Sequence, residues 1–391
     1  MQPALGDRSL FPRLEARAYL AHAAVAPLSR PVVDGMQELI ELGAHIGFEA
    51  TGTLAERADL AADRFAALVG TAPENIARVA NTSTGVTAIS TAFDFAPGDR
   101  VVVFDGEFPT NVTPWAAAAE PAGAELVRVP VAPFLRSHAE GLAAFDAAVD
   151  ERVRLIAVSA VQFQSGLAMP LAELAQRARA LGAKLFVDGI QGVGARPIDV
   201  EALGIDYLSC GGHKWLGGPL GTAYLYVAPA AREELRPRQI GWISHEDAFI
   251  FLNAANELRY DRPLQANARA FETGVLNFAG LAGSAAALEL LLELSPASIF
   301  EHLQAWHDAI EPGVEALGWR SLRSAEPAGR SGILSFAPPD PLDPAEVVTR
   351  LGQRGIVATP PDGCLRLAPH WSNPLSEVPF VLEQLERATW S

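Results

Sequence analysis

The sequence contains little cysteine, with only Cys210 and Cys364 among its 391 residues. Two thiols are too few for a disulfide framework or a cysteine-rich zinc site, and this count is typical of a reducing compartment. The N-terminal stretch Met1 to Arg13 contains an acidic residue and proline and has no apolar core. We therefore expect no signal peptide and a cytoplasmic protein.

Long apolar runs and excess positive charge are also missing. Glycine, glutamate or serine interrupts the longest apolar runs before they reach the length of a membrane span. The formal net charge is −16, which disfavours nucleic acid and anionic membranes as partners and favours solubility. No repeat of fixed period and no low-complexity tract is present.

The sequence does contain a regular alternation of strand-like and helix-like segments. Hydrophobic residues make up 49% and charged residues 19% of the chain, as in ordinary soluble enzymes. Short runs of Val, Ile and Leu between alanine-rich stretches predict an α/β fold, with a mostly parallel sheet covered by helices on both faces. The predicted strands are 101–104, 125–131, 154–159, 184–188, 206–209 and 223–227.

The pattern of predicted strands and helices changes near residue 280, and this change suggests the domain organisation. We expect an N-terminal arm, 1–30, that packs on the small domain, a large domain, 31–280, and a smaller α+β domain, 281–391. Within the large domain, a helix should begin at Pro31 and end near Leu42, and a second should end at Gly70. The glycine-rich stretch 43–52 is predicted to be the loop between them.

Two motifs carry candidate chemistry. Lys214 lies among small residues in Gly212-His213-Lys214-Trp215-Leu216, directly after a predicted strand. A lone lysine is most often a solvated surface residue, but a buried one becomes a nucleophile able to form a Schiff base. Upstream, Asp188 ends an apolar strand and opens Asp188-Gly189-Ile190-Gln191. The ends of such strands are where open α/β sheets bind ligands, although an aspartate there can also simply cap a helix.

Together these motifs resemble the class V aminotransferase group of fold-type I pyridoxal 5'-phosphate (PLP) enzymes, which includes cysteine desulfurases, isopenicillin N epimerase and C–S lyases. The resemblance covers about residues 19–373 and implies a seven-stranded, mostly parallel sheet in the large domain. It implies that Lys214 binds the cofactor aldehyde as a Schiff base and that Asp188 pairs with the pyridinium nitrogen. It also implies that Gln191 hydrogen-bonds the ring hydroxyl; otherwise Gln191 would be a solvated turn residue.

A run of hydroxyl residues, Asn81-Thr82-Ser83-Thr84-Gly85, precedes a predicted helix. Free N–H groups and hydroxyls at a helix N-terminus bind anions, although simple capping is the commoner role. The resemblance assigns Thr82, Ser83 and His213 to the cofactor phosphate. The chain departs from the family pattern where it has Gly211, since many relatives carry serine or threonine at this position.

Two further stretches are assigned by the same resemblance. Phe108 occupies the position whose side chain stacks on the cofactor; desulfurases have histidine there, and phenylalanine cannot exchange protons. Arg366 corresponds to the arginine that clamps the substrate carboxylate, a task suited to its planar fork. The alternatives are a core aromatic and a solvated arginine at a strand edge.

The sequence leaves several reactions open. Cys364 lies on the wrong segment for the nucleophile of a desulfurase, so we expect a packed cysteine and no persulfide chemistry. We expect β-elimination on a small amino acid, as in a C–S lyase, with epimerisation or transamination as alternatives. The resemblance places His22 and His45 at the substrate pocket of a homodimer, His45 from the neighbouring subunit, although each is more often a surface residue.

An NAD-dependent oxidoreductase would share the α/β texture. It needs a Gly-x-Gly-x-x-Gly motif after its first strand, and the glycines at 189, 192 and 194 have another spacing and follow a late strand. We therefore expect a PLP-dependent lyase or transferase with no metal.

Overall fold

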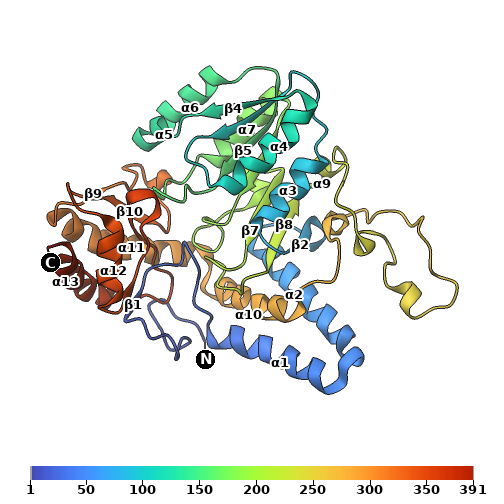
Figure 1. Ribbon diagram of the computed structural model, residues 1–391, viewed down its shortest axis with the longest axis horizontal. Helices are drawn as coiled ribbons and strands as arrows, with labels where there is room; N and C mark the ends of the chain where they lie inside the picture. Colours follow the sequence, from blue (N-terminus) through green and yellow to red (C-terminus); the bar gives the residue numbers. More distant parts are fainter. Residues whose placement is uncertain (1, 391) are drawn as a thin grey trace.

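The centre of the molecule is a seven-stranded sheet with strand order β2-β8-β7-β6-β5-β3-β4 (Figure 1). The computed structural model describes residues 2–390. Strand β8 runs antiparallel to both of its neighbours, and the other pairs are parallel, so the expected mostly parallel α/β sheet is confirmed. The strands are β2 (Ile76–Val79), β3 (Arg100–Phe104), β4 (Glu125–Val129), β5 (Val153–Ser159), β6 (Lys184–Asp188), β7 (Tyr207–Gly211) and β8 (Ala223–Val227).

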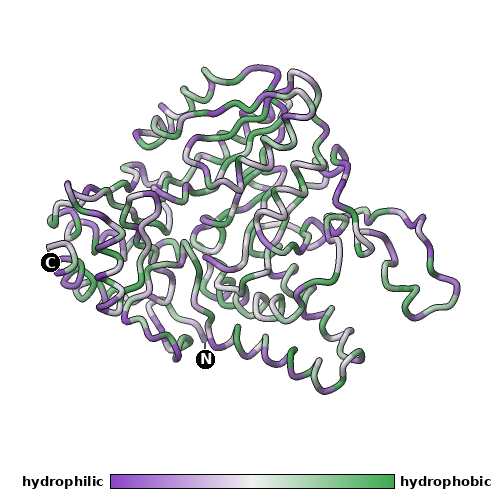
Figure 2. The backbone as a smooth tube through the Cα atoms, in the orientation of Figure 1, coloured by the Kyte–Doolittle hydropathy of each residue, from purple (hydrophilic) through white to green (hydrophobic). Residues whose placement is uncertain are grey.

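Both faces of this sheet are buried, which explains its unbroken apolar strands. Along β3, Val101 and Val103 belong to one apolar cluster, and Val102 and Phe104 to the other, because side chains alternate between the two faces. Helices α3 (Thr82–Ala92) and α4 (Thr113–Ala122) contribute to the first cluster. Helices α2 (Thr51–Val69), α6 (His138–Ala148) and α7 (Leu171–Leu181) contribute to the second. In Figure 2 the central strands are correspondingly apolar.

The stretch 43–52 is not the loop that its glycines predict. Helix α1 (Arg30–Ile46) continues through Gly43, a short 3-10 turn covers Gly47–Ala50, and α2 begins at Thr51. Only Gly47 has a positive φ, of 56°, so the other glycines simply adopt helical backbone. At the far end of α2, Gly70 has φ 71° and ψ 45° and caps the helix, as predicted.

The C-terminal part forms a second, smaller core. Its three-stranded sheet has the order β12-β10-β9, and the N-terminal strand β1 (Ala18–Tyr19) pairs in parallel with β11 (Ile356–Val357). Helix α10 (Phe278–Leu294), which spans the proposed boundary at 280, packs against α1 and α2. The domain division stays a prediction. The remaining elements are α5 (Ala132–Arg136), α8 (Val200–Leu203), α9 (Pro229–Arg232), α11 (Pro296–Ala316), β9 (Arg320–Ser321), β10 (Leu334–Ala337), α12 (Pro344–Gly352), β12 (Leu365–Leu367) and α13 (Val378–Thr389).

One long segment leaves the body of the molecule. Residues 240–262, between α9 and α10, project outward in Figure 1 and carry several exposed apolar side chains. Within residues 2–390, no single helix has both the length and the apolar character needed to cross a bilayer. Helices α10 and α11 reach this length and apolar character only when they are taken together, and the chain bends by 77° between them.

Candidate active site

The candidate site lies where β6 and β7 end. These strands are parallel neighbours, with Asp188 opposite Ser209, so their carboxyl ends meet at one edge of the sheet. Asp188 is the last residue of β6, and Lys214 follows β7 by three residues. The fold therefore brings the two motif residues together, as their spacing predicts.

Burial places the titration of both groups near neutral pH. It lowers the pKa of Lys214 to about 8, with the nearby Asp188 carboxylate acting in the opposite direction. Burial raises the pKa of Asp188 to about 6, although its carboxylate accepts a hydrogen bond from the Ile190 N–H at 3.0 Å and faces Lys214. An amine that is readily deprotonated thus lies close to a buried carboxyl group, which suits an exchange of protons with a ligand.

An aromatic pair covers the lysine. The Lys214 Nζ atom lies 5.7 Å from the ring centroid of Phe108, which follows β3 and is 46% exposed. The rings of Phe108 and Phe163 are nearly perpendicular, with a centroid distance of 5.4 Å. Phe108 therefore presents an accessible ring near the amine, in a position where a planar ligand could stack.

The N-terminus of α3 forms a candidate anion site. The first N–H groups of a helix have no partner within the helix. The Thr82 hydroxyl is buried and has no hydrogen-bond partner among the described residues. A Cβ added at Gly211 would lie 3.0 Å from this hydroxyl and 2.9 Å from Ile190, so the hydroxyl packs closely against the glycine backbone. Ser83 is exposed and shares a 2.8 Å hydrogen bond with Thr110. Asn81 Oδ1 caps the Thr84 N–H at 2.9 Å, and the unsatisfied Thr82 hydroxyl at this helix N-terminus fits a phosphate.

Gln191 and His213 lie beside these groups. The Gln191 Nε2 atom donates to the Ala23 carbonyl at 3.0 Å, and its Oε1 accepts from the Trp215 indole at 2.8 Å. The amide is thus oriented by the N-terminal arm and by the residue after the lysine. His213 is partly buried next to Gly211, and burial, together with Lys214, lowers its pKa.

The two substrate-clamp candidates come from opposite ends of the chain. Arg366 on β12 is buried; its Nε donates to Thr359 Oγ1 at 3.1 Å and its Nη1 to the Phe163 carbonyl at 2.7 Å. Burial lowers the pKa of Arg366 to about 10, so it remains a cation at neutral pH. His22 is buried in the arm, and its Nδ1 lies 3.0 Å from the Ala368 carbonyl. Burial holds the pKa of His22 well below its usual range.

The structure does not bring His45 to this site. His45 is exposed in the last turn of α1, a helix that runs outward from the body of the molecule (Figure 1). Within one chain it lies on a separate surface, and its expected role depends on a second subunit.

Glu107 is a site residue that sequence reasoning missed. Its buried carboxylate accepts hydrogen bonds from the Ser159 N–H at 2.7 Å, from the Ser159 hydroxyl, and from Gln162 Nε2 at 3.0 Å. Burial raises the pKa of Glu107 to about 7, and the neighbouring Asp188 adds to this. The available signal was an acidic residue directly before Phe108, just beyond the end of an apolar strand.

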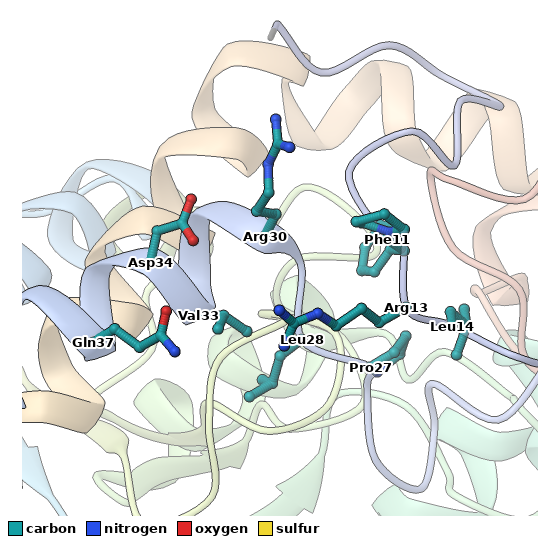
Figure 3. Close-up of a pocket in the computed structure, with 10 residues that line it drawn as sticks. Phe11, Arg13, Leu14, Pro27, Leu28, Arg30, Val33, Asp34 and Gln37 are labelled. Atoms are coloured by element: carbon teal, nitrogen blue, oxygen red, sulfur yellow. The ribbon is translucent and has the colours of Figure 1, made fainter.

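A separate hollow of about 270 Å³ lies between the arm and the start of α1. Figure 3 shows Phe11, Arg13 and Leu14 on the arm side, facing Val33 and Gln37 on the helix. This hollow contains none of the residues described above, so it is distinct from the candidate site.

Known proteins resemble this chain over most of its length. Residues 18–372 match the family described as aminotransferase class V. The uncharacterized aminotransferase YcbU of Bacillus subtilis is 26% identical over 383 residues, covering 98% of this chain and 97% of that protein. A cysteine desulfurase of Dickeya dadantii is 32% identical over 333 residues, covering 82% of this chain and 76% of the relative. A mutant of C-DES, with glycine covalently linked to its PLP cofactor, has a TM-score of 0.88 at 22% identity, covering 97% of this chain and 99% of that one.

Proposed function

Because the chain belongs to the class V aminotransferase family and its cofactor is pyridoxal phosphate, we propose that it is a lyase that eliminates a β-substituent, often sulfur, from a small amino acid. Bound PLP supplies a protonated ring that accepts electrons from the substrate Cα. The proposal of a lyase rests on the burial of both cysteines, since a desulfurase would require a nucleophilic thiol.

Neither cysteine of the sequence is placed as such a nucleophile. Cys364 is buried immediately before β12, and burial raises the pKa of its thiol. Cys210 is fully buried within β7, where burial raises the pKa of its thiol well above the usual value. A thiolate is the reactive form of cysteine, so both side chains are held in the unreactive state.

The other residues then have distinct tasks. Lys214 would hold the cofactor covalently through Nζ and would take up the Cα proton of the substrate, for which a pKa of about 8 suits an amine. Asp188 would hold the proton of the ring nitrogen, and Phe108 would lie against the ring. Arg366 binds the substrate carboxylate; its Nη2 donates to no group among the described residues.

Three more groups hold the cofactor. Thr82 and Ser83 bind the phosphate at the N-terminus of α3, with His213 beside them. Gln191 approaches the ring hydroxyl with the Nε2 hydrogen that the Ala23 carbonyl leaves free. His22 lies behind the pocket as a neutral side chain and contacts the substrate or the lysine loop.

We propose further that the enzyme is a homodimer and that His45 of the partner subunit completes the substrate pocket. Apolar side chains are exposed at the tip of α1 and along residues 240–262, where Tyr260 is 91% exposed. Contiguous exposed apolar residues mark protein–protein contacts.

The test is to incubate the PLP-loaded protein with a panel of small amino acids, including cysteine and cystine. Elimination predicts pyruvate and ammonia, with sulfide or a persulfide released into solution. The Cys364→Ser and Cys210→Ser proteins should retain this activity. Loss of sulfur release in Cys364→Ser would instead establish a desulfurase, and the proposed chemistry would be wrong.

Two other outcomes are diagnostic. Conversion of the cofactor to its amine form, with a keto acid as product, would identify an aminotransferase, the class to which the B. subtilis relative is assigned by name. Exchange of the Cα proton with deuterated solvent, without net product, would identify an epimerase.

A further inference from the structure

Trp215, the residue after the cofactor lysine, is tightly packed in the protein interior. Trp215 is fully buried, and two glycines make room for it. A Cβ added at Gly194 would lie 2.5 Å from the Trp215 carbonyl oxygen, and one added at Gly332 would lie 2.8 Å from the indole ring. The Trp215 indole also donates to Gln191 at 2.8 Å. The backbone that carries Lys214 is therefore in tight contact with distant parts of the chain.

The peptide carbonyls on both sides of the lysine have partners from outside the loop. The carbonyl of His213 accepts a hydrogen bond from the Ala26 N–H of the arm at 2.8 Å. The carbonyl of Trp215 lies 2.8 Å from Nε2 of His370. The Lys214 carbonyl accepts from the Gly217 N–H at 3.0 Å within the loop. Three successive carbonyls are thus fixed, the outer two by segments far away in the sequence.

The direction of the His370 bond follows from its other ring nitrogen. The Trp371 N–H donates to Nδ1 of His370 at 2.7 Å, so Nδ1 is an acceptor. The ring proton must then be on Nε2, which donates to the Trp215 carbonyl. The ring is 2% exposed and contacts His22 edge-on at 5.2 Å. Burial lowers the pKa of His370 to about 4, so this neutral tautomer persists at neutral pH.

We propose that His370 is a positioning residue for the cofactor lysine, because its Nε2–H holds the Trp215 carbonyl and thereby fixes the backbone that places the Lys214 amine beside Asp188. His370 is itself fixed, since its N–H donates to Asn373 Oδ1 at 2.8 Å. The bond joins the segment after β12, which carries Arg366, to the lysine loop after β7.

Loss of this bond has a defined consequence for the amine. The lysine side chain is held in a partly desolvated position that lowers its pKa. A loop released at Trp215 lets the amine move toward solvent, and its pKa then rises toward the 10.5 of an ordinary lysine. The same movement weakens the covalent attachment of PLP.

Two substitutions separate the functions of the two ring nitrogens. Glutamine reaches the position of Nε2, so His370→Gln keeps a donor for the Trp215 carbonyl and loses the acceptor for the Trp371 N–H. Asparagine reaches only the position of Nδ1, so His370→Asn keeps the acceptor and loses the donor. If His370 acted only by filling space, His370→Gln would not resemble the wild type more closely than His370→Asn does.

The sequence makes the lysine easy to observe, because Lys184 and Lys214 are its only lysines. Reductive methylation of the cofactor-free full chain with ¹³C-formaldehyde gives one NMR signal for each lysine, besides that of the α-amino group. Lys184 serves as the internal reference. It begins β6, at the opposite edge of the sheet from Asp188, and pairs with Glu234 at 2.8 Å. The visible absorbance and the release rate of PLP are measured in parallel on the loaded protein.

We expect the Lys214 signal to titrate near 8 in the wild type and in His370→Gln. In His370→Asn the midpoint should rise by about one unit, with several-fold faster release of PLP. The control is His302→Asn, which removes a comparable Nε2 contact of 2.8 Å, to the Asn373 carbonyl, and should leave Lys214 unchanged.

Equal shifts in both His370 variants, or no shift in His370→Asn, would overturn the proposal. If His370→Asn gave no folded protein, His370→Gln would still decide, because a protein that keeps the donor must keep the wild-type titration of Lys214. A failed lyase assay leaves this test intact, since neither readout depends on turnover.

Discussion

At the scale of single residues, the site is a set of ionisable groups whose protonation is set by burial. Asp188 and Glu107 are both buried, and burial raises their pKa values to about 6 and about 7. Lys214 is shifted the other way, to about 8. The lysine normally titrates far above the two carboxyl groups, and here all three titrate within a narrow interval, which is how a protein prepares proton transfer at neutral pH.

Glu107 should make the stability of the cofactor-free protein depend on pH. Its pKa is higher in the folded state, about 7, than the ordinary 4.5, so the folded protein binds this proton more tightly than the unfolded chain. Its contribution is fully present below the unfolded pKa and is lost as the pH rises through about 7, by up to about 3 kcal/mol. Glu107→Gln should flatten the decline in the free energy of unfolding between about pH 5 and pH 8.

Urea unfolding of both proteins at the two pH values measures this effect. Glu383→Gln is the matched control, because Glu383 is an exposed carboxylate on α13 that pairs with Arg387. Asp188 leaves a residual slope of the same sign. An unchanged slope in Glu107→Gln would show that Glu107 is not the titrating group.

The sequence predicted the residues of the site that have distinctive neighbours in the chain. Lys214 and Asp188 stand in recognisable motifs, and the fold brings them to adjoining strand ends. Glu107 and His370 could not be predicted in the same way. Their roles depend on contacts with Ser159 and Trp215, which are 52 and 155 residues away along the chain.

At the scale of elements, the position of α3 determines the anion site. The helix lies directly on β7 because Gly85 has no side chain, and a Cβ there would lie 2.2 Å from the Ser209 hydroxyl. The Ser209 hydroxyl in turn donates to the Thr82 carbonyl at 3.0 Å. The first turn of α3 is thus held against the strand that leads to the lysine.

Thr82→Val should weaken PLP binding without destabilising the cofactor-free protein. The Thr82 hydroxyl is buried and has no partner among the described residues, so its loss costs no internal hydrogen bond. A hydrogen bond to a charged phosphate is worth about 1.5–3 kcal/mol, which corresponds to a dissociation constant at least about tenfold higher. Titration by absorbance gives the affinity, and urea unfolding without PLP should show equal or greater stability.

Thr91→Val is the control on the same helix. Thr91 is exposed, and its hydroxyl donates to the Thr87 carbonyl at 2.7 Å, away from the site. Its affinity for PLP should match that of the wild type. If Thr82→Val bound PLP normally, the phosphate would have to lie elsewhere.

Elements with strong local patterns were predictable, and those without them were not. The parallel strands are continuous apolar runs and were found, as was the glycine cap that ends α2 at Gly70. Strand β2 was missed because it has four residues and contains Arg78, whose charge is buried against Glu272 at 2.8 Å. The helical stretch 43–52 was mistaken for a loop because glycine content outweighed the backbone geometry that its neighbours impose.

At the scale of the whole molecule, the exposed apolar surface is the main feature that one chain leaves unexplained. Phe48, which follows α1, is 71% exposed, and Tyr260 in the projecting segment is 91% exposed. His45 is three residues before Phe48 in the sequence and is exposed in the last turn of α1. Large exposed apolar side chains often mark contact surfaces, which supports the proposed second subunit as the partner.

The proposed homodimer makes a prediction about shared sites. A Lys214→Arg chain has no lysine to bind the cofactor, and a His45→Ala chain should provide a defective contact to its partner. If His45 acts across the interface, each pure homodimer has low activity. In a mixed dimer, one site combines Lys214 of the His45→Ala chain with His45 of the Lys214→Arg chain, and this site is intact. Co-expression of differently tagged chains and purification through both tags gives the mixed dimer.

Its activity should exceed that of both parents, measured with whichever amino acid the wild type turns over. In the control, a Lys184→Arg chain takes the place of the Lys214→Arg chain. The Lys184→Arg chain keeps both Lys214 and His45, so its homodimer should be active. Three results would contradict the shared site: full activity of the His45→Ala homodimer, no gain in the mixed dimer, or a monomer in sedimentation analysis. In the first case His45 is an ordinary surface residue. In the others, the apolar surfaces of α1 and residues 240–262 serve a contact that does not complete the active site.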